Sequence, residues 1–359
     1  MNLAERIHAE IASAGGWLPF DRFMAMALYE PGLGYYAGGR RKFGQMPSEG
    51  SDFVTAPEMS PLFGRALARQ VAQALVASGC REVMEFGAGS GALAAQLIAE
   101  LDALDAGLVR YRIVELSAEL RERQQERLAH WSERVEWLDT LPEQIEAVVI
   151  GNEVLDAMPV QLVAFDGQVW RERGVVSLGE GFAFEDRDSH LRPPLETGLV
   201  PGTVTEIHPQ AEAFMRTLAR SLKRGAAFFI DYGFPESEYY HPQRHGGTLM
   251  CHQSHLADAD PLVAVGDKDI TAHINFTGIA LAGQDAGLVV LGYTSQANFL
   301  LNCGIAELLT GASLGERAMA HRLLAEHEMG ELFKVVGFAP LNAPFDALGF
   351  ERGDRSHKL

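Results

Sequence analysis

Three glycines stand close together in the stretch EFGAGSGALA at residues 85–94, at positions Gly87, Gly89 and Gly91. The stretch continues the apolar run EVMEF (82–86), which is typical of a buried strand. Glycines between a strand and a helix let the backbone approach a bound nucleotide closely. Two cofactors with unrelated chemistry fit such a turn: a nicotinamide dinucleotide and S-adenosylmethionine.

Two carboxylates beside the turn favour S-adenosylmethionine. Glu85 precedes Gly87 by two residues, where it would repel the pyrophosphate of a dinucleotide but attract the ammonium and sulfonium groups of S-adenosylmethionine. Glu115 ends the next predicted strand, 110–116, where a carboxylate can accept hydrogen bonds from both ribose hydroxyls. Both cofactors carry a ribose, so only Glu85 discriminates between them. A structural acid at Glu85 and a solvated strand end at Glu115 are the alternatives.

Four further residues are candidates for holding this cofactor. Leu138 and Asp139 end the third predicted strand, 134–138, so Leu138 would flank the adenine and Asp139 would bind its amino group. Thr55 and Glu58 would offer polar contacts to the amino-acid end of the cofactor. They lie in a long loop rich in aromatic residues, which we expect to fold over the cofactor as a lid. A surface loop tied down by its aromatic side chains is the alternative.

Apolar stretches of strand length alternate with stretches of helical periodicity along most of the chain. Such alternation predicts an α/β fold, with a mostly parallel, Rossmann-like sheet that helices cover on both faces. The strands are expected at 82–86, 110–116, 134–138, 147–159 (running into a turn), 226–233, 286–294 and 332–340. The helices are expected at 2–14, 19–29, 60–78, 91–104, 117–130, 209–222 and 296–328.

The predicted elements divide the chain into two parts. Residues 1–60 hold two helices and the lid loop, and residues 61–359 form the main domain. Insertions interrupt the main domain at about 160–205 and 234–275. The first insertion has an Asp-Gly pair between alternating apolar and polar residues, which predicts an antiparallel hairpin.

The composition argues against some partners and favours one compartment. There are 48 acidic and 30 basic residues, a formal charge of −18, which opposes binding to nucleic acids and to anionic membrane surfaces. Solubility alone is another explanation for the acidity. Three cysteines without a pattern favour a reducing compartment. No apolar run approaches the ~18 residues of a membrane span. Nor does the start look like a signal peptide or a mitochondrial presequence, so we expect a cytoplasmic protein.

Six motifs occur in this order along the chain: YEPGLGYYAGG, SDFVTAPEMSPLFG, EFGAGSGALA, GNEVLDAMPV, IDYGFP and DITAHINFT. With them the sequence, from about residue 15 to residue 340, strongly resembles the MidA-like class I methyltransferases. Mitochondrial members of that family assist assembly of respiratory complex I by methylating an arginine of one subunit. The resemblance implies a seven-stranded methyltransferase sheet, S-adenosyl-L-methionine as the cofactor, and a protein arginine as the acceptor, a respiratory-complex subunit being one candidate. Asn275 stands where the family usually carries an acid.

The motif GNEVLDAMP (151–159) offers side chains for such an acceptor. Methyl transfer is an in-line displacement, so the enzyme must align both reactants and exclude water. A guanidinium stays cationic, and carboxylates can hold its fork. Glu153 follows the fourth predicted strand and Asp156 lies one helical turn further on, so we expect both to bind the guanidinium and Asn152 to contact the cofactor. Structural roles for both acids are the alternatives.

His273 is the histidine that we expect to act as a base, because it lies in the polar motif TAHIN; a hydrogen-bonded structural role is the alternative. No metal site is expected, since the histidines of CHQSH have no second ligand pair at usable spacing. Three other functions stay open: an assembly factor that binds the cofactor without catalysis, a small-molecule methyltransferase, and a nicotinamide oxidoreductase. The oligomeric state also stays open, a homodimer included.

Overall fold

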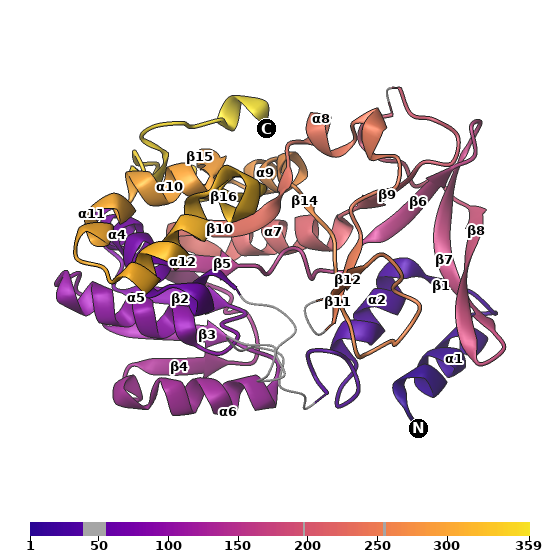
Figure 1. The fold of residues 1–359 in the computed structure, drawn as a ribbon, viewed down its shortest axis with the longest axis horizontal. Coiled ribbons are helices and arrows are strands. Elements are labelled where there is room, and N and C mark those ends of the chain that lie inside the picture. The colour runs from indigo at the N-terminus through magenta and orange to yellow at the C-terminus, as the bar shows by residue number, and fades with distance from the viewer. Residues whose placement is uncertain (39–54, 197, 254–255) are drawn as a thin grey trace.

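A twisted sheet of seven strands forms the centre of the protein in the computed structural model, which describes residues 1–38, 55–196, 198–253 and 256–359 (Figure 1). The strand order is β15-β16-β10-β5-β2-β3-β4. Their bounds are β2 Glu82–Phe86, β3 Arg110–Val114, β4 Val135–Leu138, β5 Ile145–Asn152, β10 Leu222–Phe234, β15 Leu288–Ser295 and β16 Phe333–Pro340. Strand β16 runs antiparallel to both neighbours, whereas β4, β3, β2, β5 and β10 are parallel. The predicted seven-stranded, mostly parallel methyltransferase sheet is therefore confirmed.

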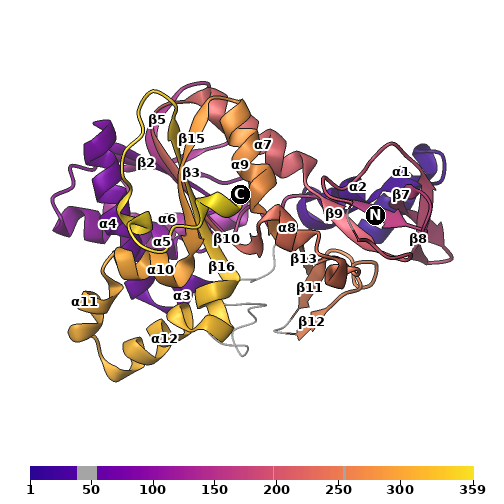
Figure 2. The same cartoon turned by 90° about the horizontal axis from the view of Figure 1, so that it is seen from above.

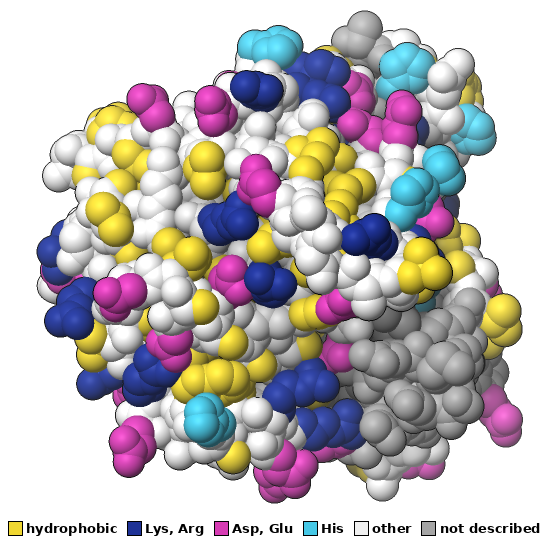
Figure 3. Space-filling model, turned by 60° about the vertical axis from the view of Figure 1, so that its left-hand side comes forward, with side chains coloured by type: hydrophobic (Ala, Val, Ile, Leu, Met, Phe, Trp, Pro, Cys, Tyr) yellow, Lys and Arg dark blue, Asp and Glu magenta, His cyan; other side chains and the backbone are white. Residues whose placement is uncertain are grey.

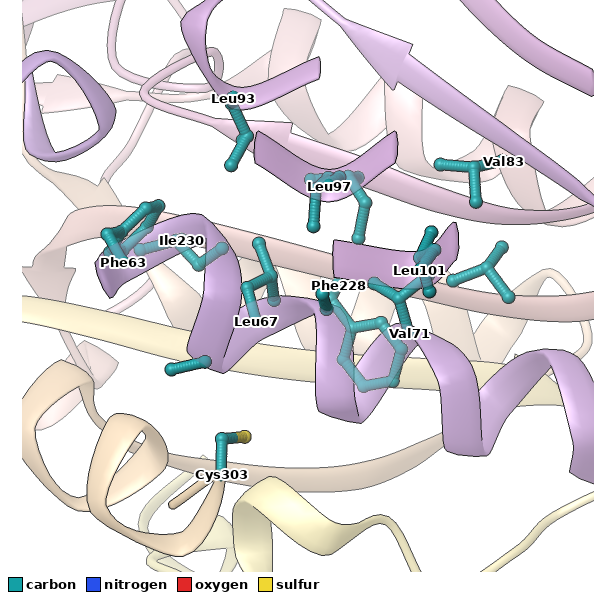
Figure 4. Packing of buried hydrophobic residues seen from close by; sticks show 14 of the residues in the cluster. Phe63, Leu67, Val71, Val83, Leu93, Leu97, Leu101, Phe228, Ile230 and Cys303 are labelled. Atoms are coloured by element: carbon teal, nitrogen blue, oxygen red, sulfur yellow. The ribbon is translucent and has the colours of Figure 1, made fainter. Parts of the chain in front are cut away.

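Helices cover both faces of this sheet, and each face has its own apolar core. The helices α4 (Pro61–Ser78), α5 (Ala92–Ala103), α10 (Gln296–Asn302) and α12 (Leu314–Leu324) pack on one face, and α7 (Pro209–Ser221) and α9 (Phe276–Asp285) on the other. Successive strand residues point to opposite faces, so Phe228 enters the first core and Phe229 the second. Figure 4 shows Phe228 among the side chains of α4 and α5.

Local sequence signals set the ends of several helices. Helix α4 begins after Ser60, whose hydroxyl accepts a hydrogen bond from the Leu62 N–H, and it ends at Gly79, which adopts a φ of 68°. Helix α6 (Ala118–Arg127) begins after Ser117, whose hydroxyl accepts a hydrogen bond from the Leu120 N–H. Asn275 caps α9 in the same way, so this side chain serves a helix end.

An accessory lobe lies beside the sheet and combines segments that are far apart in sequence. Helices α1 (Leu3–Ser13) and α2 (Phe20–Tyr29) pack against an antiparallel sheet of β1 (Leu18–Pro19), β6 (Gln161–Phe165), β7 (Trp170–Leu178), β8 (Gly181–Asp188) and β9 (Val204–Ile207). The hairpin expected in the first insertion is confirmed as β6–β7. The N-terminal helices and both insertions thus share one core, and Figure 2 shows the lobe standing apart from the central sheet.

Short elements connect the two lobes. A small sheet contains β11 (Met250–Gln253), β12 (Leu256–Asp258) and β13 (Asp269–Thr271), and the short strand β14 (Ile274–Asn275) pairs with the end of β10. The remaining helices are α3 (Ala56–Met59), α8 (Glu236–Tyr239) and α11 (Ile305–Thr310). Much of the predicted lid, residues 39–54, lies outside the described residues.

The structure gives more detail for two predicted segments. The helical segment expected over 296–328 consists of α10, α11, α12 and a π-helical turn at Glu326–Gly330. Gly304, with a φ of 79°, precedes α11, and Ser313 forms a capping box at the start of α12, so local signals interrupt the helix twice. The strand expected to run into a turn within 147–159 does so, and it ends at Asn152 because the next residue has a positive φ.

In Figure 3, Lys and Arg side chains alternate with Asp and Glu, so on this face the net negative charge is not gathered into one acidic patch. Among the residues that the structure describes, no helix combines the length and the apolar character needed to cross a bilayer.

We predict that Phe228→Ala destabilises the fold by about 3–5 kcal/mol, because it leaves a cavity in the core between the sheet and α4. Phe228 is fully buried and contacts the rings of Phe299 and Phe350. Urea unfolding followed by circular dichroism measures the loss. Leu314→Ala is the control, since Leu314 is 86% exposed and its truncation should change stability by about 0.5 kcal/mol or less. Equal effects of the two substitutions would contradict this assignment of the core.

Candidate active site

A cavity of about 1190 Å³ opens at the carboxyl ends of the central strands, where α/β sheets bind their ligands. The glycine turn after β2 and the loops after β3 and β5 form one side of it. Side chains of α2, β11 and β13 from the other lobe form the opposite side. The cavity is therefore shared by the two lobes, and it is large enough for a cofactor together with an acceptor side chain.

The turn between β2 and α5 depends on its glycines. Gly87, Gly89 and Gly91 have φ values of 60°, 53° and 80°, in the left-handed region that side chains disfavour. A Cβ at Gly87 would also lie 3.2 Å from a methyl carbon of Val154. Gly87 and Gly89 line the cavity, and Gly91 is the N-cap of α5. Backbone N–H groups of the turn and of the first turn of α5 are thus brought close to the cavity.

Glu85 lies below this turn as a buried carboxyl group that lines the cavity and is 2% exposed. The Tyr111 hydroxyl donates a hydrogen bond to its Oε2 at 2.6 Å. Burial raises the pKa of Glu85 to about 7, against the lowering by Tyr111. A positively charged ligand in the cavity would favour the ionised form, as the sequence argument about the sulfonium cofactor requires.

Glu115 follows β3 and is tied to the glycine turn through Gln124. The carboxylate accepts hydrogen bonds from the Ser117 N–H and from the Gln124 side-chain amide, both at 2.9 Å. The same Gln124 amide donates to the Gly89 carbonyl at 2.9 Å, and the Gln124 carbonyl accepts from the Trp137 indole at 2.9 Å. Gln124 is fully buried. One side chain therefore sets the spacing between the carboxylate and the glycine turn.

Helix α3 is hydrogen-bonded to the glycine turn through Glu58. The Glu58 carboxylate accepts hydrogen bonds from the Ser90 hydroxyl in the turn and from the Arg127 guanidinium, the latter at 2.9 Å. Arg127 also donates to the Ser90 hydroxyl at 2.6 Å. Thr55, directly before α3, lines the cavity as well. Glu58 thus anchors α3 to the turn in addition to lining the cavity.

Glu153 stands at the end of β5 in a strained backbone conformation. Its φ of 54° is unusual for a residue with a side chain, and its N–H donates to the Ile230 carbonyl of the neighbouring strand at 2.9 Å. The Asn152 side-chain amide donates to its Oε1 at 3.0 Å. Burial, reinforced by the nearby Asp156, raises the pKa of Glu153 to about 8. A cation at this position would bring Glu153 into its ionised form.

Asp156 and Asp231 form a buried pair of acidic residues beside Glu153. The Asp231 carboxylate accepts hydrogen bonds from the N–H groups of Leu155 and Asp156, at 2.9 Å and 3.2 Å, which holds the loop after β5 against β10. The Tyr232 hydroxyl donates to Asp156 Oδ2. Burial raises the pKa of Asp156 to about 6, and burial together with the charge of Asp156 raises the pKa of Asp231 well above its usual range.

The accessory lobe adds polar groups to the cavity from the opposite side. The Tyr36 hydroxyl lies 2.9 Å from both oxygens of Asp269. His273 packs against the Tyr232 ring, with centroids 5.0 Å apart, and burial lowers its pKa to about 4, so the imidazole is neutral. Tyr29 donates to the Ala157 carbonyl at 2.8 Å. Aromatic side chains thus lie beside the acids on this side of the cavity.

Three residues that line this cavity carry a buried polar atom that lacks a hydrogen-bond partner among the described residues. They are Asn152 Oδ1, Asp156 Oδ1 and His273 Nδ1. Asn and Asp oxygens accept hydrogen bonds, and one nitrogen of a neutral imidazole also accepts. Buried polar atoms without partners are costly, so this group indicates a ligand that is rich in donors.

The structure brings most of the predicted site residues together. Glu153, Asp156 and His273, predicted as catalytic, line the cavity. The predicted cofactor residues Thr55, Glu58, Glu85, Gly87, Gly89, Glu115 and Asn152 line it too. Gly91, Leu138 and Asp139 are not part of the lining; Asp139 is an exposed residue whose carboxylate pairs with Arg121 at 2.5 Å. The described residues contain no cluster of three or more His, Cys, Asp or Glu side chains suited to a metal ion.

Sequence reasoning overlooked Gln124, Asp269 and Thr271. Gln124 lies in a charged helix, and nothing in its neighbourhood marks it as buried. Asp269 and Thr271 belong to the motif DITAHINFT, from which only the histidine was assigned a role. The alternation of polar and apolar residues in that motif is the signal that could have identified them.

The chain is similar to known proteins over most of its length. Residues 66–294 match the family of S-adenosyl-L-methionine-dependent methyltransferases. The chain belongs to this family. Among solved structures, a protein of Burkholderia thailandensis that is bound to S-adenosyl-homocysteine is 53% identical, with a TM-score of 0.96 over 99% of this chain and 96% of that one. A native crystal structure from the same organism is 51% identical, with a TM-score of 0.90 and the same coverage.

Curated relatives of this methyltransferase are more distant. The mitochondrial protein arginine methyltransferase NDUFAF7 of Mus musculus is 26% identical over 386 residues, which cover 90% of this chain and 81% of the relative. Its counterpart in Danio rerio is also 26% identical, over 92% of this chain and 84% of the relative. The methyltransferase family and its cofactor, S-adenosylmethionine, are thus established.

The residues around the glycine turn of the methyltransferase fit this cofactor. The turn contributes only small residues to the lining, Glu85 and Glu115 favour a cation and ribose hydroxyls, and Asn152 has an acceptor atom without a partner among the described residues. Glu85 and Asn152 lie at the ends of adjacent strands, β2 and β5. We expect Glu115 to bind the ribose and Glu85 to attract the charged end of the cofactor.

We predict that Gln124→Leu weakens binding of S-adenosyl-homocysteine by the methyltransferase about tenfold or more, because it removes hydrogen bonds to Glu115 and Gly89. Isothermal titration calorimetry measures the affinity. Gln125→Leu is the matched control, since Gln125 is the exposed neighbour on the same helix and should leave the affinity unchanged. An unchanged affinity in Gln124→Leu, with Gln125→Leu also unchanged, would refute the positioning role of Gln124.

We also predict that Glu153 contributes a loss of stability of the ligand-free methyltransferase as the pH rises from about 4.5 to about 8. The pKa of Glu153 is raised to about 8 from its ordinary 4.5, so the folded protein holds a proton that the unfolded chain releases over this range. The contribution of Glu153 is fully present below pH 4.5 and is lost as the pH passes 8. Glu153→Gln should flatten the curve of unfolding free energy against pH measured with urea.

Glu143→Gln, at an exposed position, is the control for this measurement and should keep the slope of the wild type. Asp156, Asp269 and the Asn152 side chain are the other polar groups that act on Glu153, and the backbone of Ala56 also contacts it. These groups remain in the Glu153→Gln variant, so part of the slope of the unfolding free energy against pH persists. A Glu153→Gln curve as steep as that of the wild type would show that Glu153 is ionised in the ligand-free protein.

Proposed function

We propose that this methyltransferase transfers the methyl group to an arginine side chain of a protein. The observation that carries the proposal is the pair of carboxyls on the acceptor side of the cavity, Glu153 and Asp156, with the buried Asp231 beside them. Carboxyls so close together cannot all be ionised without a cation. A guanidinium supplies this charge, and it donates up to five hydrogen bonds while accepting none.

The acceptor atoms beside the carboxyls favour the same acceptor group. Asn152 Oδ1, Asp156 Oδ1 and His273 Nδ1 are buried acceptors without partners among the described residues. A neutral hydroxyl or phenol acceptor would satisfy one of them and would leave the carboxyls without a counter-charge. A guanidinium fork can satisfy several at once, with charge-assisted bonds to the carboxylates.

Each residue then has a distinct task in the reaction. Glu153 and Asp156 bind the guanidinium and concentrate its positive charge on the nitrogens they face, which leaves the attacking nitrogen more nucleophilic. Asp231 positions the loop through its bonds to the backbone, and Tyr232 orients Asp156. His273, a neutral imidazole in the lining of the cavity, is our candidate for the base that accepts the proton released by the methylated nitrogen. When bound, the cofactor supplies an electrophilic methyl group on a sulfonium.

The distant relatives support a protein as the carrier of the arginine. The NDUFAF7 proteins of mouse and zebrafish are named protein arginine methyltransferases and match this chain over about nine-tenths of its length. A cavity that opens between two lobes also suits a side chain presented by a larger molecule. We further propose that the acceptor protein is encountered in the cytoplasm.

We predict that the purified methyltransferase transfers labelled methyl groups from S-adenosylmethionine to proteins in an extract of cells lacking it, and that acid hydrolysis releases the label as methylarginine. Glu153→Gln should reduce the rate about 10²–10³-fold, the cost of removing one partner of a buried ion pair. The affinity for S-adenosyl-homocysteine should stay within about twofold of the wild type, because the acceptor and not the cofactor loses its contact.

Glu143→Gln, on the surface, should retain full activity as the control. Label recovered in another amino acid, or only in small molecules, would overturn the arginine proposal. A protein that binds the cofactor tightly but labels nothing would point to the non-catalytic assembly factor. Unchanged turnover in Glu153→Gln would remove Glu153 from the acceptor site.

A further inference from the structure

The last residue of α2, Tyr29, places an aromatic ring in the wall of the cavity. Ala27 and Leu28, directly before it, are fully buried in the core of the accessory lobe, whereas Tyr29 is 37% exposed. An aromatic ring offers a large apolar surface with a negative face, and in the wall of a cavity such a surface is suited to contact with a ligand. Tyr29 can therefore contact a molecule that enters the cavity.

Two contacts hold the Tyr29 ring in one orientation. Its hydroxyl donates a hydrogen bond to the Ala157 carbonyl at 2.8 Å, on the loop that carries Glu153 and Asp156. The Tyr36 ring stacks against it, with centroids 5.5 Å apart and an angle of 20° between the two planes. These contacts engage the hydroxyl and one face of the ring. The exposed part of Tyr29 consequently has a fixed orientation before a ligand binds, which lowers the entropic cost of binding.

The Tyr29 ring also lies close to the acids of the proposed acceptor site. Burial of the hydroxyl, and then the charges of Asp269 and Asp156, raise the pKa of Tyr29 far above its ordinary value, so the hydroxyl keeps its proton and the ring stays neutral. Asp156 directly precedes Ala157, the residue to which Tyr29 is hydrogen-bonded. A cation bound by Asp156 would therefore lie beside this ring.

We infer that Tyr29 is the platform on which the acceptor guanidinium stacks, while Glu153 and Asp156 bind its edge. This inference rests on the proposed function and adds a specificity-determining residue that comes from the accessory lobe. A guanidinium donates hydrogen bonds only within its plane, so carboxyls can satisfy its edges but not its two faces. An aromatic ring attracts a cation over its face and packs closely against a flat group.

Stacking on Tyr29 would favour an arginine over other acceptors of similar size. A neutral planar group gains no cation attraction from the ring, and an ammonium has no flat face to align with it. The ring would also keep the guanidinium plane from tilting, and the alignment of the attacking nitrogen with the methyl group depends on that plane. The hydrogen bond to Ala157 joins the ring to the loop of the acids, so the face and edge contacts keep a constant relative position.

The experiment uses N-acetyl-L-arginine methylamide as the probe and the full-length methyltransferase saturated with S-adenosyl-homocysteine. Nuclear magnetic resonance titration measures the affinity for the probe. We expect Tyr29→Leu to weaken arginine binding about five- to tenfold, because the aromatic face is lost. Tyr29→Phe keeps the ring and should bind within about threefold of the wild type. Replacing Tyr29 with pentafluorophenylalanine, which reverses the charge of the ring face, should weaken binding about fivefold or more relative to Tyr29→Phe.

The matched control is Phe184→Leu, since Phe184 is 36% exposed in β8 of the same lobe and lies outside the lining of the cavity. It should bind the probe like the wild type, and every variant should keep its affinity for S-adenosyl-homocysteine, which shows that it is folded. If Tyr29→Leu binds arginine as Phe184→Leu does, or if the fluorinated ring binds it as Tyr29→Phe does, the stacking role is refuted while the proposed function stands. If the wild type itself binds no arginine probe, the proposed function fails and this inference fails with it.

Discussion

Buried carboxyl groups around one cavity are the constraint on which the acceptor side of the molecule depends. An isolated carboxylate in such a place is unstable unless a proton or a cation neutralises it. Glu153, Asp156 and Asp231 are held there by strand ends and by hydrogen bonds that the sheet imposes, so the fold maintains an unfavourable arrangement in the absence of a ligand. Strained backbone at Glu153 adds to this cost. Such stored unfavourable energy is typical of sites that bind an opposite charge.

The cofactor side of the cavity, in contrast, is formed largely by residues that lie close together in sequence. A strand, a turn with three glycines and a helix occupy consecutive residues, and the carboxylates at 85 and 115 lie at strand ends that are adjacent in the sheet. The periodicity of the chain could therefore predict the sheet, the turn and both acids. Asp139 was also placed at a strand end, but the chain leaves the sheet there and the carboxylate pairs with Arg121 on the surface. Which direction a side chain takes after a strand is decided by tertiary packing.

The residues that sequence reasoning overlooked are brought to the site by contacts between segments that are separated in the sequence. Gln124 matters because helix α6 brings it beneath the glycine turn, and its partners lie 35 and 9 residues away in the chain. Asp269 and Thr271 face the cavity because an insertion folds back onto the N-terminal helices. The predicted division into residues 1–60 and a main domain relied on the order of the elements along the chain. The apolar residues of both insertions and of α1 and α2 instead assemble into one core, which no local pattern could reveal.

The accessory lobe therefore has a physical reason to exist beside a sheet that already binds the cofactor. In-line transfer needs two reactants at a fixed angle and distance, and the carboxyl edge of a sheet alone holds only one of them. Contacts between the lobes connect the two halves of the site: Tyr29 donates to the Ala157 carbonyl, and the Ala272 N–H donates to the Asp156 carbonyl. Both contacts end on the loop that follows β5, between the cofactor turn and the acidic group. A shift of the accessory lobe would thus move the acceptor acids relative to the cofactor, so the same contacts that build the cavity also set the alignment of the reaction.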